Sequence, residues 1–423
     1  MYVIYNAIIR FIVLGSKFIA KGMLPRMDAP KNRLFLIVAE GILANIVLGT
    51  MFVWTVLRAP LLELFPTWTD GMLSIIFGIH NLFTCSGILL GGRLCAKISP
   101  RKVFMLFALL VFVGLSGYAF LPVAHPKAAY VMAFILFCCF AATGIGVGIS
   151  AVQSSTIPWF PKNSGVISGA LYMSLGFSSV ILAAIAQKLL PVIGVRYVMP
   201  VFGAIVLFVS VIVLTDRKSV LPPTTEVSSG PSDEGLDTYK MIRTRAFWLL
   251  LVWNLSLRTA GLILLDHAAG IGTAAGGLVL ASMLISPANG LGCLSIGFAL
   301  DKFGIKRVMT ADAALMLIAG LLLCLGVYSV SFTPILAGLI FGGFAYGGSS
   351  SSYVASLKNT FGAKHYSQNF AFANISMGCA ALFESASGTV LDMGGYLPIV
   401  AIVAVLAVLA LALSLPAGKT ELE

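Results

Sequence analysis

Long apolar stretches separated by short polar connections dominate the chain. A helix needs about 20 mostly apolar residues to cross a bilayer, and twelve stretches meet that length. We place them at residues 34–57, 71–95, 103–122, 129–154, 165–189, 197–215, 246–267, 276–300, 308–330, 334–357, 369–391 and 396–416. Six lie on each side of residues 216–245, a Pro-, Ser- and Gly-rich stretch typical of a flexible linker. The pattern predicts an all-α membrane protein with twelve transmembrane helices in two six-helix halves, residues 31–215 and 246–416, and a tail at 417–423.

Basic residues near the ends of the spans predict the orientation. If both termini are cytoplasmic, the inward segments carry 21 Lys and Arg residues and the outward segments carry 4. The positive-inside rule therefore favours cytoplasmic termini in a cell membrane, inner or plasma. Residues 1–30 are apolar, but Arg10, Lys17 and Lys21 share one helical face. We expect this segment to lie in the membrane interface, with a misassigned start codon as the alternative.

Composition excludes several classes of function. The chain is 59% hydrophobic and only 10% charged, against about 25% charged residues in a soluble domain. Its excess of basic residues sits at span ends and forms no continuous stripe, so we expect no nucleic-acid partner. The seven cysteines lie inside apolar segments without metal-ligand spacing, and no nucleophile–base pairing is evident. We therefore expect no metal, no cofactor and no enzymatic activity.

Two short basic loops recur at matching places in the two halves. Residues 92–102 read GRLCAKISPRK, and residues 297–307 read GFALDKFGIKR. Both resemble the signature G-x-x-x-D-[RK]-x-G-[RK]-[RK] of the major facilitator superfamily. The second copy matches at Gly297, Asp301, Lys302, Gly304, Lys306 and Arg307. The first keeps Arg101 but has Ala96 for the aspartate and Ser99 for the glycine. The resemblance implies a two-half transporter in which these loops form an inner gate and the acid pairs with helix ends and arginines.

Four further stretches resemble the oxalate–formate antiporter and monocarboxylate-porter branch of that superfamily. They are FVWTVLRAPL at 52–61, PWFPKNSGVISG at 158–169, MIRTRAFWLL at 241–250 and FGAKHYSQNFAF at 361–372. The branch commonly has an arginine in span eight and a lysine in span eleven that neutralise carboxylates. Here Cys293 and Met377 stand at those positions. Because unpaired charge is costly to desolvate, this departure argues against oxalate, a dianion, as the substrate.

Arg258 is the strongest candidate for substrate binding. It lies near the middle of the seventh span, where a charged residue is a functional candidate by default. The resemblance implies that spans one, four, seven and ten line a central cavity, so Arg258 would hold a carboxylate there. Trp54, Tyr346, Tyr353 and Gln153 would shape the same pocket. The alternative is a structural ion pair between Arg258 and an intramembrane acid.

Five other ionisable residues are candidates for proton coupling. Glu40 lies in span one, His80 in span two and Glu384 in span eleven, and Asp266 and His267 end span seven. A carboxyl group or a histidine inside a membrane can carry a proton. The plainer alternatives are pairing of Glu40 or Glu384 with Arg258, hydrogen bonding of His80 between helices, and solvation of Asp266 and His267 at the helix end.

Together these features predict a secondary transporter that works by alternating access. We expect its substrate to be a small organic anion, a monocarboxylate, moved by proton symport or exchange by a monomer in the lipid bilayer. One alternative is an exporter of a neutral or cationic amphiphilic compound. Another is a non-transporting receptor or scaffold, although residues 216–245 show no evident binding motif.

Overall fold

The structure is a computed structural model that describes residues 31–50, 54–160, 163–215, 235–274 and 280–414. The described part of the N-terminal half consists of α2 (Lys31–Leu48), α3 (Trp54–Leu64), α4 (Asp70–Cys95), α5 (Pro100–Ser116), η2 (Gly117–Phe120), α6 (Pro126–Phe134), η3 (Ile135–Ala142), α7 (Thr143–Thr156), η4 (Ile157–Trp159), α8 (Ser164–Ile193) and α9 (Val195–Thr215). The rest consists of α10 (Thr238–Met241), α11 (Arg245–Ala274), α12 (Leu280–Phe303), α13 (Ile305–Tyr328), α14 (Phe332–Phe361), α15 (Tyr366–Ala373), α16 (Ile375–Ser385), α17 (Ser387–Gly394) and α18 (Tyr396–Ser414).

Each expected span corresponds to one helix or to helical segments in series, which confirms the all-α fold. Eight helical stretches of the described residues are long and apolar enough to cross a membrane. Only a third of the α18 stretch is buried inside the protein, and half or less of the α5, α12 and α13 stretches. Helices that leave apolar residues uncovered in this way are suited to a lipid environment.

Four spans depart from a single regular helix in the described part of the chain, span three by ending in the 3₁₀ helix η2. Span one contains α2 and α3, and span four changes to π-helix over η3 before continuing as α7. Span eleven is divided into α15, α16 and α17. Asn374 and Ala386, at the two junctions, have ψ values of 0° and −17°. Such interruptions are tolerated inside a membrane protein where neighbouring helices or side chains satisfy the backbone, and they frequently mark functional positions.

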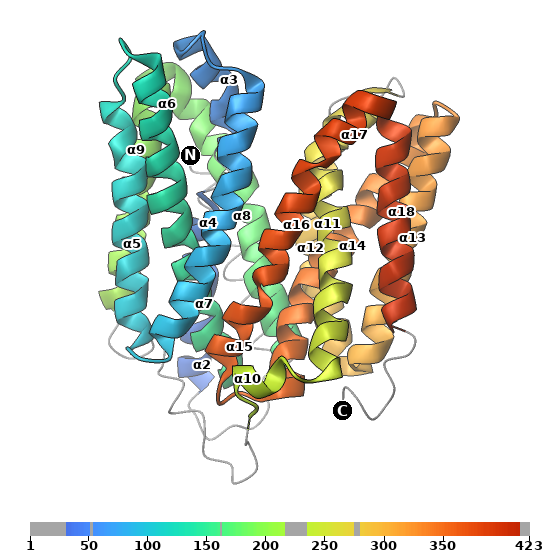
Figure 1. Cartoon of the computed structure of the whole chain (residues 1–423). Helices are drawn as coiled ribbons and strands as arrows, with labels where there is room; N and C mark the ends of the chain where they lie inside the picture. Colours follow the sequence, from blue (N-terminus) through green and yellow to red (C-terminus); the bar gives the residue numbers. More distant parts are fainter. Residues whose placement is uncertain (1–30, 51–53, 161–162, 216–234, 275–279, 415–423) are drawn as a thin grey trace.

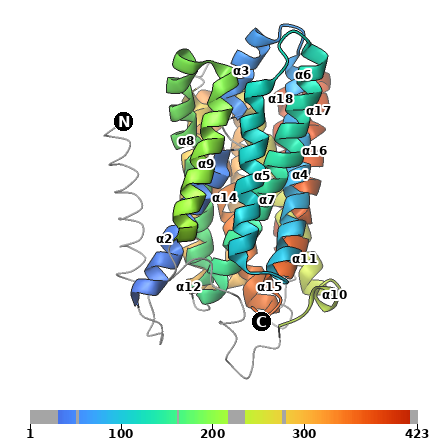
Figure 2. The ribbon, with the colours of Figure 1, turned by 90° about the vertical axis from the view of Figure 1, so that its left-hand side faces the viewer.

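The helices form two bundles that lie side by side (Figure 1). The bundles are joined at the end that carries α10 and α15 and diverge toward the end that carries α3, α6 and α17. Viewed from the side, the long helices run along a common axis (Figure 2). The halves meet mainly through α8 against α12 and α14, and through α4 against α15 and α16.

The last residues of the expected linker pack onto the C-terminal half, whereas residues 216–234 lie outside the described part. Asp237 caps α10, its Oδ1 accepting a hydrogen bond from the backbone N–H of Lys240 at 2.7 Å. Thr238 donates to Asn369 Oδ1 at 2.8 Å, and Asn369 Nδ2 donates to the Leu236 carbonyl at 2.9 Å. These bonds fix the entry to span seven against the start of span eleven.

Candidate functional site

The joined ends of the two halves are connected through Asp301. This residue lies in the last turn of α12, and its carboxylate faces the first turn of α8. Oδ1 accepts a hydrogen bond from the Gly165 N–H and Oδ2 accepts one from the Val166 N–H, each at 2.8 Å. The first N–H groups of a helix have no partner within the helix and carry partial positive charge. Asp301 therefore caps α8 across the interface between the halves.

Glycines let α8 and α12 approach closely beside this cap. A Cβ atom added at Gly297 would lie 2.2 Å from the carbonyl oxygen of Gly165, and one added at Gly165 would lie 2.2 Å from the carbonyl oxygen of Gly297. One turn further, a Cβ at Gly169 would lie 2.3 Å from the Cys293 carbonyl oxygen. Two further bonds cross between the halves here, from Ser164 Oγ to Asn359 Oδ1 and from Ser168 Oγ to the Ser351 carbonyl, both 2.9 Å.

The other residues of the expected gating loops are placed less directly. Lys302 and Arg307 are exposed, and the Lys302 ammonium lies 5.3 Å from the Phe303 ring centroid. The side chain of Arg101 lies outside the described residues. Sequence reasoning did not single out Lys358, which is 8% exposed and interacts electrostatically with the Asp301 carboxylate. The basic partner of the acid thus comes from α14 and not from its own loop.

The second contact between the halves joins α4 to α15 and α16. A Cβ added at Gly92 would lie 2.2 Å from the Ala371 Cβ and 2.7 Å from the Ser367 carbonyl oxygen. About two turns earlier in α4, the Cys85 thiol donates a hydrogen bond to the Asn374 carbonyl at 3.4 Å. This carbonyl lies at the junction between α15 and α16, where helix geometry is interrupted.

Arg258 lies where the elements of both halves converge. It is 7% exposed, and its Nη1 donates to Asn374 Oδ1 at 3.4 Å. The hydroxyl groups of Tyr172 on α8 and Tyr346 on α14 interact with its guanidinium. Among the residues that the structure describes, no carboxylate lies within ion-pair distance of Arg258. Tyr172 and Asn374 were not predicted from the sequence, because neither differs from an ordinary packing residue there.

Two of the predicted pocket residues share this neighbourhood through α14. Tyr353 is buried and interacts electrostatically with Arg258, while its hydroxyl donates to the Ala373 carbonyl at 3.1 Å. The serines beside them satisfy their hydroxyls mostly within α14, Ser349 and Ser350 both donating to the Tyr346 carbonyl. Serine in a helix often bonds to a backbone carbonyl three or four residues earlier, so this face needs no water to satisfy it.

The N-terminal half contains a stack of buried rings. Trp54 on α3 stacks on Phe137 of η3 at 4.5 Å between ring centroids, and Phe137 stacks on His80 of α4 at 4.2 Å. Nδ1 of His80 lies 3.2 Å from the Phe137 carbonyl oxygen. Trp54 Nε1, His80 Nε2 and Gln153 Oε1 are buried without a hydrogen-bond partner. Glu40 is half-buried on α2. The placement of these residues in the substrate and proton sites remains a prediction.

Three of the predicted proton-coupling residues are brought together at the end where the halves diverge. The carboxyl groups of Asp266 on α11 and Glu384 on α16 interact directly. His267 Nε2 lies 2.7 Å from Ser387 Oγ and 3.7 Å from Asp266 Oδ2. Asp266 is exposed, whereas His267 is buried. Glu384 therefore has an acid and not Arg258 as its neighbour.

Sequence reasoning missed Asp312, on α13. It is 1% exposed, and neither of its carboxyl oxygens has a hydrogen-bond partner. It stands only seven residues after the start of α13, close to the basic loop at Lys306 and Arg307, where an acid resembles an ordinary helix-end residue. An acid inside a predicted span was nevertheless a signal that could have identified it.

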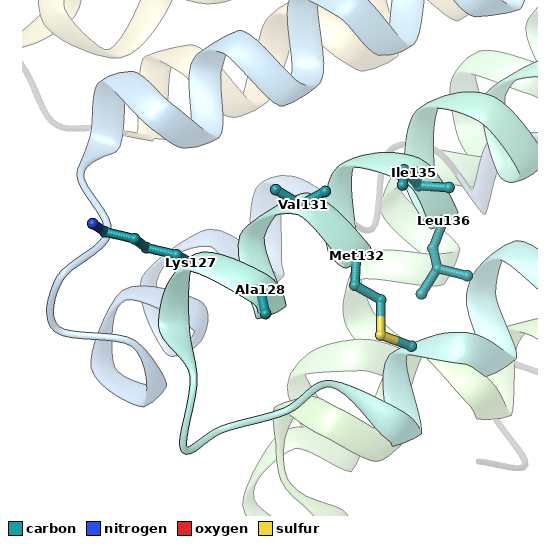
Figure 3. A pocket seen from close by; sticks show the side chains of 6 residues that line it. All are labelled: Lys127, Ala128, Val131, Met132, Ile135 and Leu136. Atoms are coloured by element: carbon teal, nitrogen blue, oxygen red, sulfur yellow. The ribbon is translucent and has the colours of Figure 1, made fainter.

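A shallow depression on the surface lies away from these groups, at the start of span four (Figure 3). It is lined by Lys127, Ala128, Val131, Met132, Ile135 and Leu136. Lys127 is the first of these along the chain, and the other five side chains are apolar. Among the described residues no cluster of His, Cys, Asp or Glu is arranged to hold a metal ion. Arg258 and its neighbours are therefore the better candidate for a polar substrate.

Comparisons with known proteins agree with the architecture. The chain is 23% identical over 376 residues to the oxalate:formate antiporter of Oxalobacter formigenes, covering 84% of each protein. It is also 23% identical to the uncharacterized MFS-type transporter YhjX of Escherichia coli K12, covering 81% of this chain and 84% of that one. Its fold is similar to that of the proton:xylose symporter XylE, with a TM-score of 0.71 at 14% identity over 91% of this chain and 95% of the other.

A family model confirms the family that the repeated basic loops indicated. One architecture, a two-half helical transporter, accounts for three features of the structure. They are the described spans, the pairing of the halves through α8 and α12, and the acid of the second loop. The family model of the Major Facilitator Superfamily matches residues 34–265, more than half of the chain. The chain belongs to the Major Facilitator Superfamily.

Proposed function

We propose that this transporter moves a small organic anion, a monocarboxylate, across the membrane by proton symport or exchange. The observation that carries the proposal is the buried Arg258 guanidinium, which adjoins elements of both halves and has neutral partners in the described part of the chain. A buried cation is costly unless an anion neutralises it. A guanidinium also offers parallel N–H groups that suit a carboxylate.

The neighbours of Arg258 support a substrate with one negative charge. Asn374, Tyr172 and Tyr346 supply polar groups without formal charge. Cys293, which stands where the branch commonly has a cation, is also close enough to interact with Arg258. One cation compensates one carboxylate, so a dianion would keep an uncompensated charge in a low-dielectric site. The name of the antiporter relative is compatible with a carboxylate substrate, but we expect formate, lactate or pyruvate to be preferred over oxalate.

On the orientation predicted from the basic residues, the halves are joined at the cytoplasmic side and diverge toward the outside. Asp266, His267 and Glu384 then lie at the outer side. The carboxyl groups of Asp266 and Glu384, which interact directly there, are candidates to receive a proton from the outer solution before it passes further into the protein. We infer that substrate and proton enter from this side while Asp301 holds the inner side closed.

The test is uptake into proteoliposomes loaded with unlabelled solute, with labelled formate, acetate, lactate, pyruvate or oxalate outside. Wild type is compared with Arg258→Gln, Arg258→Lys and the control Lys188→Gln, which removes an exposed cation of α8. We expect exchange of a monocarboxylate that falls at least tenfold in Arg258→Gln, partly returns in Arg258→Lys and persists in Lys188→Gln. No flux of any acid by folded wild-type protein would contradict the proposal.

The same series addresses an exporter of a neutral or cationic amphiphile. That alternative gains from Cys293 and Met377, which replace the two cations common in the related branch. A positive charge at Arg258 would repel a cationic substrate. Transport of a lipophilic cation that is unchanged or faster in Arg258→Gln would favour the exporter over the carboxylate transporter.

A further inference from the structure

Asp312 occupies a closed space between three helices of the C-terminal half. A Cβ atom added at Gly348 of α14 would lie 2.9 Å from Asp312 Oδ1 and 2.2 Å from the Ile296 side chain of α12. One helical turn before Asp312, Val308 packs with Ile296, Leu300 and Ala355 in a small apolar cluster. Only a glycine at 348 leaves room for the carboxyl group against α14. Asp312 thus faces the backbone of α14 at Gly348, beside Ile296, and its carboxyl oxygens have no hydrogen-bond partner there.

Among the residues that the structure describes, no charged group compensates Asp312. The titratable or charged groups of the elements packed against α13 are Cys293, Asp301 and Lys302 on α12, Tyr346, Tyr353 and Lys358 on α14, Arg245, Arg258, Asp266 and His267 on α11, and Tyr396 on α18. Of these, only Cys293 interacts electrostatically with Asp312. An ionised carboxylate buried without a partner carries a large desolvation penalty, which binding of a proton removes.

The position of Asp312 links it to the moving parts of the site. Cys293 interacts with Asp312 on one side and with Arg258 on the other. The Cys293 carbonyl accepts a hydrogen bond from Ser351 Oγ at 2.8 Å and lies at the close approach between α12 and Gly169 of α8. Asp312, on α13, therefore lies next to α12, the helix that forms the interface with α8. On the proposed function, this interface must open when the inner side opens. Movement of α12 against α8 would change the surroundings of the carboxyl group.

We propose that Asp312 is a proton-binding site that couples proton movement to transport. This inference rests on the proposed function and deepens it, because it assigns the symported proton to a residue. In the inner-closed state the Asp312 carboxylate takes up a proton that has entered from the outer solution, and an O–H bond forms. When α8 and α12 separate, water reaches Asp312, the O–H bond breaks, and the proton passes to inner water while the carboxylate is hydrated. The substrate anion and this proton leave together, so a complete cycle moves no net charge.

The transport test separates coupling from binding. Wild type, Asp312→Asn and Asp312→Glu are reconstituted with labelled pyruvate, lactate or formate, and accumulation driven by an inward proton gradient is compared with exchange without a gradient. Asparagine resembles the protonated acid in shape but cannot release a proton. We expect Asp312→Asn to lose at least tenfold of the gradient-driven accumulation and to keep exchange within about threefold of wild type, with partial recovery of accumulation in Asp312→Glu. The matched control Glu63→Gln, which removes an exposed acid of α3, should retain both activities.

A second measurement does not depend on transport. The infrared carbonyl-stretching band of a protonated carboxylic acid is recorded for wild type and Asp312→Asn at neutral pH, in light and heavy water. A protonated Asp312 gives a band in the wild-type-minus-variant difference spectrum that shifts in heavy water. Absence of the band, or full gradient-driven accumulation by folded Asp312→Asn, would overturn the proton site. Absence of flux in the wild type together with a clear band would instead overturn the carboxylate assignment alone.

Discussion

The two basic loops occupy equivalent places in the two halves but join their helices differently. In the second, the single residue Gly304 connects α12 to α13 with φ at +82°, a conformation that favours glycine. In the first, four residues separate α4 from α5, and Ser99 is extended with φ −61° and ψ 140° before Pro100. A residue that precedes proline is restricted to extended conformations, so this loop makes its turn without a glycine.

The two loops also differ in the contacts that they make with the opposite half of the protein. Asp301 bonds across to the first turn of α8, whereas its counterpart Ala96 is exposed and has no group to offer α15. The α8–α12 interface thus has a charged cap in addition to close backbone packing. The contact of α4 with α15 combines close packing with the Cys85–Asn374 hydrogen bond, and none of its described residues forms a charged cap. The two loops thus occupy equivalent places in the repeat but differ in their chemistry, and we expect the α4–α15 interface, which lacks the acid, to separate more readily than the α8–α12 interface.

Removal of the cap should have the largest effect. In Asp301→Ala the Gly165 and Val166 N–H groups lose their acceptors, and hydrogen bonds to a charged group contribute about 1.5–3 kcal/mol each. We expect the inner-closed state to lose about 3 kcal/mol and net transport to fall roughly 100-fold. Hydrogen exchange followed by mass spectrometry should show faster exchange in the first turn of α8.

The control for this comparison is Lys306→Gln, which removes an exposed charge from the same loop and should leave α8 protected. Asp301→Asn should give an intermediate result, since one amide oxygen can still accept. Unchanged protection of residues 164–168 in Asp301→Ala would show that packing alone closes this end of the molecule.

Much of this asymmetry could be predicted from the sequence. The lengths of the apolar runs predicted both halves, and the loop motifs located the acid at Asp301 and its absence at Ala96. The resemblance implied helix ends and arginines as partners of the acid, but the sequence did not identify the helix as α8. Every helix begins with N–H groups that lack a partner within the helix, and only the tertiary fold brings those of α8 to α12. Lys358 was treated as an ordinary inward basic residue for the same reason.

The candidate site shows the same limit. A charge in the middle of a span made Arg258 conspicuous, but Tyr172 and Asn374 became its neighbours only when spans five and eleven were placed beside span seven. For Glu384 the sequence left open proton coupling or pairing with Arg258, and only the fold of α16 shows that its neighbour is Asp266. Asp312 stands out because neither of its carboxyl oxygens has a hydrogen-bond partner among the described residues. This property of the packed structure could not be predicted from the sequence.

The next prediction compares the backbone packing of the two interfaces. In Gly297→Ala the new methyl group meets the Gly165 carbonyl oxygen, a backbone atom that no substitution removes. Overpacking typically costs about 1–3 kcal/mol, so we expect roughly tenfold slower transport. In Gly92→Ala the shortest contact is with the Ala371 side chain, at 2.2 Å.

The double variant Gly92→Ala/Ala371→Gly should therefore recover most of the activity lost in Gly92→Ala, apart from the remaining 2.7 Å approach to the Ser367 carbonyl oxygen. Uptake and thermal unfolding of the purified proteins measure the recovery. Equal loss in the single and double variants would mean that the α4–α15 interface is as rigid as the α8–α12 interface.

The smallest effect is expected from adding the missing acid to the first loop. In Ala96→Asp a carboxylate would stand one turn beyond Gly92, the residue that contacts Ser367 at the start of α15. At this exposed position an interaction with the helix N-terminus contributes about 0.3–1 kcal/mol and weakens with salt. We expect both interfaces then to hold the inner side closed, slowing uptake by about two- to fivefold at low ionic strength and less at high ionic strength.

Ala96→Asn, which lacks the charge, should transport at the wild-type rate. Slower uptake by Ala96→Asn, or a slowing in Ala96→Asp that salt does not relieve, would mean that the side chain obstructs the loop and that the missing charge does not explain the difference between the two gates.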